Sequence, residues 1–221
     1  MNSDINIIGE SGLQFFGKIS ASISHEINNV LAIINENAGL LDDFTIMADK
    51  GMPIDPKRLK NVASKILVQI RRADEIVRNM NTFSHTIDQI KADLDLRETV
   101  EFVVTLSHRF ASMRGITIEI KPPENIVIIS TAAFFLENLI WLCLDFAMNI
   151  TGSAKTISIL IEETGSGGRI RFAGLEGLTS ELADTFPSDR ETALLGMLKS
   201  ELTVSAEEKE LILYLPKLHN L

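Results

Sequence analysis

At 221 residues, with 45% hydrophobic and 23% charged residues, the chain is long enough for two modest domains with proper cores. Its net charge of −9 leaves no basic stripe for nucleic acid and gives no support for binding an anionic membrane. The single cysteine, Cys143, excludes disulfide and metal frameworks by count. The first residues lack a positive flank and a long apolar run, so we expect a cytoplasmic protein without a membrane span.

The first part of the chain predicts a helical hairpin. Ser11 begins a capping-box pattern, and apolar residues then recur at helical spacing to about Met47. The pattern breaks at residues 50–53, and Asp55 before Pro56 supplies the N-cap and first-turn proline of a second helix. Two helices with broad apolar stripes cannot cover both stripes, which predicts a four-helix bundle made from two copies. The alternative is packing of the stripe against the chain's own second half.

Residues 24–29, in the middle of the first helix, carry the candidate functional side chains. At 100° per residue, His25 lies about 200° from the centre of the apolar stripe at Ile23, with Asn29 one turn later beside it. Glu26 lies between the polar face and the stripe. A carboxylate that binds one ring proton of an exposed imidazole leaves the other nitrogen free as a nucleophile. The alternative is an ordinary solvated surface histidine.

The second half predicts an α+β arrangement. Asp95 is expected to cap a helix that ends at Gly115. Period-two alternation and turn residues predict strands, and longer apolar patterns predict helices. In chain order we expect strands at 116–120 and 126–129, a helix at 131–148, a hairpin of 156–162 with 169–172, a short helix at 190–200, and a closing hairpin of 202–204 with 211–215.

The pattern His25, Glu26 and Asn29 resembles the phosphoacceptor box of two-component histidine kinases. In that family the histidine accepts a phosphoryl group, the adjacent acidic residue accepts or orients the imidazole proton, and the amide helps to place water when the partner is dephosphorylated. The order of elements in the second half is similar to that of the family's ATP-binding domain. His85, His108 and His219 have no acidic neighbour in the same arrangement and are expected to be ordinary residues.

The nucleotide-binding residues that the resemblance implies are replaced. In the family, the helix matching residues 131–148 carries two asparagines four residues apart, one of which holds the magnesium bound to ATP. Leu142 and Phe146 occupy those positions. The family's Asp-x-Gly-x-Gly motif matches Ala-Gly-Leu-Glu-Gly at residues 173–177, and the glycine-rich box is reduced to residues 193–197. We therefore expect that the chain does not bind ATP.

Together these features predict an N-terminal tail (residues 1–10), a dimerisation and phosphotransfer hairpin (11–92) and a degenerate ATPase-like α/β sandwich (93–221). The resemblance implies a cytoplasmic homodimer in a phosphorelay, carrying a phosphoryl group on His25 between the aspartates of response-regulator receiver domains. Magnesium would be supplied by the receiver, and this chain would bind no cofactor, nucleic acid or membrane. The alternatives are a non-catalytic adaptor, a receiver phosphatase, or a divergent ATP-dependent sensor histidine kinase.

Overall fold

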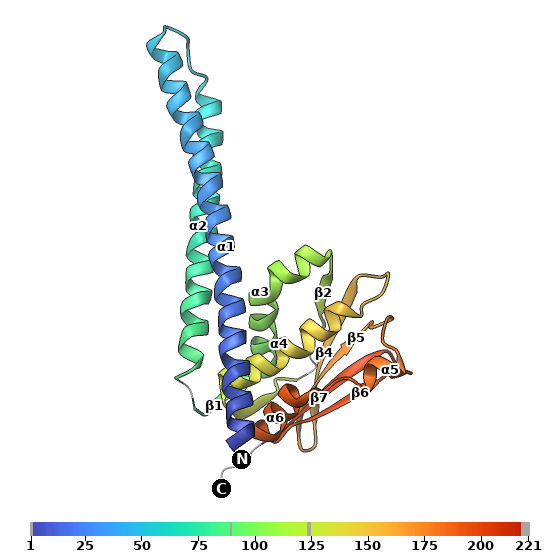
Figure 1. The fold of residues 1–221 in the computed structure, drawn as a ribbon. Helices are drawn as coiled ribbons and strands as arrows, with labels where there is room; N and C mark the ends of the chain where they lie inside the picture. Colours follow the sequence, from blue (N-terminus) through green and yellow to red (C-terminus); the bar gives the residue numbers. More distant parts are fainter. Residues whose placement is uncertain (1, 89, 123–124, 218–221) are drawn as a thin grey trace. The chain divides into compact units, whose positions relative to one another are not determined.

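Two long helices precede a domain of strands and helices in the computed structural model, which describes residues 2–88, 90–122 and 125–217 (Figure 1). The described residues form two compact units. One comprises Ser20–Ser84, and the other comprises the residues up to Ile19 together with those from His85 onward. The domain boundaries expected from the sequence stay a prediction, because compactness alone does not define independent folding.

The helical unit is built from the parts of α1 (Asn2–Asp49) and α2 (Pro56–Thr86) that lie within residues 20–84, and the two outer ends of these helices belong to the second unit. As predicted, α2 begins after Asp55, whose carboxylate accepts a hydrogen bond from the backbone N–H of Lys57 at 2.9 Å. The predicted start of α1 at Ser11 is wrong, because the helix begins at Asn2. Ser11 does not cap the helix: it is buried, and its hydroxyl accepts a hydrogen bond from the side-chain amide of Asn138 at 3.0 Å.

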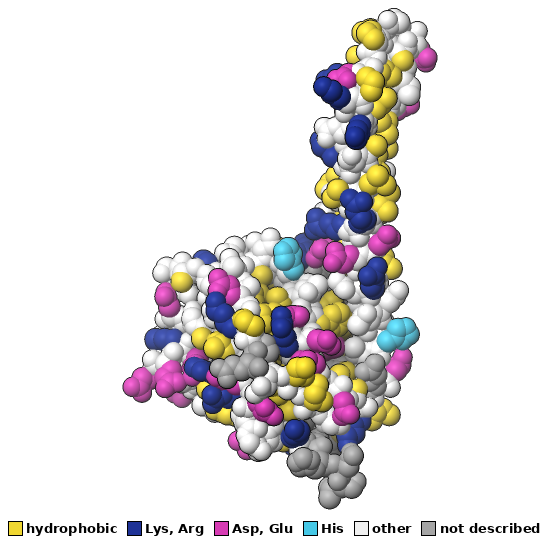
Figure 2. All heavy atoms as spheres, turned by 180° about the vertical axis from the view of Figure 1, so that it is seen from behind, with side chains coloured by type: hydrophobic (Ala, Val, Ile, Leu, Met, Phe, Trp, Pro, Cys, Tyr) yellow, Lys and Arg dark blue, Asp and Glu magenta, His cyan; other side chains and the backbone are white. Residues whose placement is uncertain are grey.

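Part of the predicted apolar stripe is buried in the single chain. Ile23 and Val30 of α1 are buried, as is Val62 of α2. A neighbouring strip on the two helices stays apolar and uncovered in the single chain, and hydrophobic side chains run along the hairpin surface in Figure 2. Its exposed members include Leu31, Ile70 and Val77.

The second unit contains a two-stranded and a five-stranded sheet. The smaller sheet pairs β1 (Ala92–Asp95) antiparallel with β3 (Ile128–Thr131). The larger has the order β2-β4-β5-β7-β6, in which β2 runs parallel to β4 and the other pairs are antiparallel. Its strands are β2 (Thr117–Ile120), β4 (Thr156–Thr164), β5 (Gly167–Ala173), β6 (Glu201–Ser205) and β7 (Glu210–Pro216).

Helices cover one face of the larger sheet. They are α3 (Leu96–Arg114), α4 (Ala133–Asn149), α5 (Ser180–Ala183) and α6 (Asp189–Leu198). The carboxylate of Asp95 caps α3 by accepting the N–H of Arg97, and Gly115 ends it in the left-handed conformation at φ 64°. The predicted α+β class is confirmed. The strand predicted at 126–129 lies two residues later, and β1 and α5 were not predicted.

Candidate functional site

His25 and Asn29 lie on the exposed side of α1 in the helical unit, as the helical spacing predicts. No hydrogen bond or ion pair to the His25 ring is found among the described residues. The imidazole is therefore accessible to a visiting protein. One helical turn separates it from the Asn29 amide.

The Glu26 side chain points toward the second helix. Its carboxylate oxygen Oε2 lies 3.6 Å from Nη2 of Arg72 on α2, and the Glu26 side chain is only 19% exposed, against 48% for Arg72. Neighbouring residues on a helix project about 100° apart, so Glu26 can face the second helix while His25 faces solvent. Sequence reasoning missed Arg72, because the register between the two helices decides which α2 residue lies opposite Glu26.

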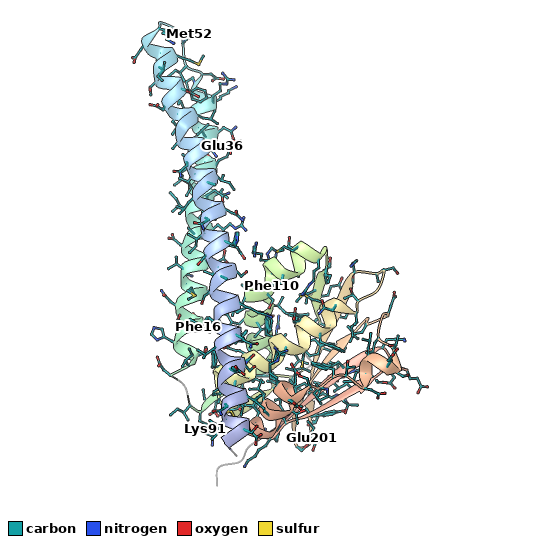
Figure 3. All side chains as sticks on the ribbon, in the orientation of Figure 1. Phe16, Glu36, Met52, Lys91, Phe110 and Glu201 are labelled. Atoms are coloured by element: carbon teal, nitrogen blue, oxygen red, sulfur yellow. The ribbon has the colours of Figure 1, made fainter. Side chains whose placement is uncertain are left out.

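A groove of about 440 Å³ begins further along the same two helices. It is lined by Ile33, Glu36, Asn37, Leu40, Ser64, Lys65, Val68 and Gln69, and Glu36 is labelled on α1 in Figure 3. The floor is polar: Asn37 is buried and donates from its side-chain amide to the carbonyl of Ile33 at 2.7 Å. The side-chain oxygen of Gln69 is buried and has no partner within the described part of the chain. The groove thus offers apolar rims and the polar side chains of Glu36, Ser64 and Lys65 to a partner.

The other described histidines lie in different settings. His85, at the end of α2, has Nδ1 3.4 Å from a carboxylate oxygen of Asp88. His108 of α3 lines a separate pocket of about 350 Å³ beside β2. His219 lies outside the described residues. Neither described residue repeats the arrangement of an exposed histidine with an acidic residue next to it and an amide one turn later.

The positions matched to the nucleotide site are occupied by the chain's own packing. Leu142 and Leu175 are buried. The ring of Phe146 stacks on that of Phe186, with centroids 4.1 Å apart and planes 6° from parallel. The backbone N–H of Leu175 donates to the carbonyl of Lys209 at 3.0 Å, and that of Gly177 donates to Ile150 at 2.9 Å. These amides are engaged within the protein, and residues 193–197 are part of helix α6.

No cluster of three or more side chains suited to a metal ion occurs in the described ranges. Within the same residues, none of the helices has both the length and the apolar character needed to cross a membrane.

Comparison with protein families and with curated proteins found no match. Solved histidine kinase structures are similar to this chain. Acinetobacter baumannii histidine kinase AdeS is 14% identical, covering 87% of this chain and 98% of that chain, with a TM-score of 0.48. Histidine kinase ThkA in complex with the response regulator TrrA is 19% identical, covering 93% and 63%, with a TM-score of 0.49. The ATP-binding domain of PrrB from Mycobacterium tuberculosis is 11% identical, covering 59% and 100%, with a TM-score of 0.48. These values describe a likeness of fold.

Proposed function

We propose that this chain is a histidine phosphotransfer protein of a two-component phosphorelay. It accepts a phosphoryl group on His25 from the aspartate of one receiver domain and passes it to another. The observation that carries the proposal is the exposed His25 imidazole, without a competing partner among the described residues, beside Glu26 and one turn before Asn29. A neutral imidazole is a good nucleophile near pH 7. Phosphoryl transfer otherwise depends mainly on positioning and charge neutralisation.

In the proposed relay, the phosphoryl group comes from a receiver and not from ATP. Two observations support a receiver, and not ATP, as the phosphoryl donor. Leu142 and Leu175 are buried, and the ring of Phe146 is stacked on that of Phe186. A triphosphate at these positions would meet apolar side chains and lose its hydration without compensation. The magnesium ion that neutralises the transferring group belongs to the receiver.

The groove between α1 and α2 supports docking of a receiver. Its rims are apolar at Leu40 and Val68, and Glu36 and Lys65 supply charges of opposite sign. A surface with this composition suits a transient interface. The solved ThkA structure contains a histidine kinase with a response regulator, and we propose a partner of the same class here.

We also propose that the active form is a homodimer. The uncovered apolar strip with Leu31, Ile70 and Val77 supports this, because a second hairpin related by a two-fold axis would bury it. Both copies of His25 would then lie on the outside of a four-helix bundle.

The test is transfer from a panel of phosphorylated receivers to the wild-type chain and to His25→Ala. We expect an acid-labile phosphoryl group on the wild type and none on the variant. His108→Ala is the matched control, because it also removes an exposed helical histidine. Circular dichroism should show that all three proteins are folded, since an exposed substitution changes stability by only about 0.5 kcal/mol. Relay at the wild-type rate by His25→Ala would overturn the proposal in favour of an adaptor.

A further inference from the structure

Arg72 is the positive charge that the fold places beside the His25 segment. Its Nη2 lies 3.6 Å from Oε2 of Glu26, the residue that directly follows His25. Both side chains belong to the same helical unit. The contact therefore follows from packing of α1 against α2 within that unit.

The ion pair is loose. At 3.6 Å the two atoms are beyond ordinary hydrogen-bonding distance, and about half of the Arg72 side chain is exposed. A loose ion pair whose arginine is half open to solvent contributes less to stability than a tightly hydrogen-bonded one, although the Glu26 side of the pair is mostly covered. The guanidinium is therefore free to exchange Glu26 for another anion, and its exposed half faces solvent, from which a phosphoryl group would arrive.

We propose that Arg72 is a catalytic residue that binds the phosphoryl group as it is transferred to His25. This inference rests on the proposed function and adds a residue to it. The planar guanidinium presents a fork of N–H donors that matches two phosphoryl oxygens, which a lysine ammonium cannot reproduce. An arginine supplied in this way neutralises the charge spread over the phosphoryl oxygens in the transition state.

The transfer step balances without any further reactant. The lone pair of one His25 ring nitrogen attacks phosphorus, and an N–P bond forms. The bond between phosphorus and the aspartate oxygen of the receiver breaks, and its electron pair remains on the aspartate as a carboxylate. The proton on the other ring nitrogen is accepted by Glu26, and the Arg72 guanidinium leaves its loose ion pair with Glu26 to donate hydrogen bonds to the phosphoryl oxygens.

The basic neighbours of Arg72 are less suited to binding the phosphoryl group. Arg71 projects about 100° away from Arg72 around α2, and no ion pair to it is found in the described part of the chain. Lys65 lines the groove about two turns away and offers a point charge. Arg71 therefore provides a matched control of the same residue type on the same helix.

Phosphoramidate, a small phosphoryl donor, allows the test without a known receiver. His25 attacks its phosphorus and ammonia leaves, and intact-mass measurement with ³¹P NMR follows phosphohistidine formation on the full chain. We expect Arg72→Gln to slow loading of His25 by about 10- to 100-fold, with Arg72→Lys intermediate and Arg71→Gln at the wild-type rate. Equal loading of wild type and Arg72→Gln would overturn the inference and leave the proposed function standing.

A double-variant comparison separates direct phosphoryl binding from positioning of Glu26. If Arg72 touches the phosphoryl group, Arg72→Gln slows loading in a Glu26→Gln background as well. If the effect disappears in that background, Arg72 acts only through Glu26 and the inference is wrong. If neither phosphoramidate nor any phosphorylated receiver phosphorylates His25 of the wild-type chain, the proposed function is wrong. This inference then fails with it.

Discussion

The hydroxyl of Thr86 donates a hydrogen bond of 3.0 Å to the Glu137 carboxyl group, joining the C-terminal end of α2 to α4. Both side chains are buried. Burial raises the pKa of Glu137 from its ordinary value of 4.5 to about 8, and the Thr86 hydrogen bond opposes this only in part. Glu137 is therefore neutral in the folded protein at pH 7.

This neutral carboxyl group predicts a pH-dependent stability. Between pH 4.5 and about 8 the folded protein binds more protons at Glu137 than the unfolded chain does. The stability associated with this group is thus fully present below pH 4.5 and is lost as pH rises to about 8, amounting to a few kcal/mol. Glu137→Gln should flatten this part of the profile in denaturant titrations. Glu10→Gln, at an exposed site on α1, is the control and should retain the slope.

Calorimetry with magnesium and ATP should detect no binding. The stacked rings of Phe146 and Phe186 and the buried Leu175 occupy the matched site, and desolvated phosphates would lie against them. The double variant Phe146→Asn with Phe186→Ala should remain unable to bind, because Ala173 and Leu175 are still present. A micromolar affinity of the wild type would contradict this prediction.

Light scattering should find a dimer that depends on the uncovered apolar strip. Ile70→Asp should give monomers, because a carboxylate in a buried helix seam costs several kcal/mol unless it is paired. Val68→Asp is the matched control, since Val68 is 50% exposed and Ile70 is 42% exposed on the same helix. Val68 lines the groove and not the strip, so its substitution should leave the dimer intact. Ile23→Asp or Ile27→Asp on the stripe of α1 should also give monomers or insoluble chains, and Ile23 is already buried in the single chain. A monomeric, well-folded wild type would show that the dimer assignment is wrong.

Glu26 and Asn29 should contribute to different reactions. Glu26→Gln should slow transfer to His25 by about 10²- to 10⁴-fold while leaving receiver binding nearly intact, because general-base assistance has that magnitude. Asn29→Ala should reduce loss of phosphate from the receiver more than transfer through His25. Single-turnover transfer and phosphate-release assays on the same receiver distinguish the two. Similar losses in both assays for both variants would contradict this division.

Receiver affinity should depend on the surface beyond His25. Glu36→Lys reverses a charge on the groove and should weaken receiver binding about tenfold, and a bulky side chain at Ala32 should obstruct docking. Loading of His25 by phosphoramidate should not change, because the small donor needs no docking surface. Asp49→Lys, at the far end of α1, makes the same charge change and should leave receiver affinity near the wild-type value. Equal affinities for all three variants and the wild type would exclude the groove as the docking surface.

Local chemistry in the sequence determined much of the fold. Asp55 and Asp95 begin helices and Gly115 ends one because capping and left-handed backbone depend on residues a few positions apart. The common face of His25 and Asn29 likewise follows from helical geometry alone. Only the tertiary structure decided that Ser11 packs against Asn138, that Glu26 meets Arg72 and that Phe146 stacks on Phe186. Those contacts join residues far apart in the chain, and their register depends on packing that no local periodicity encodes.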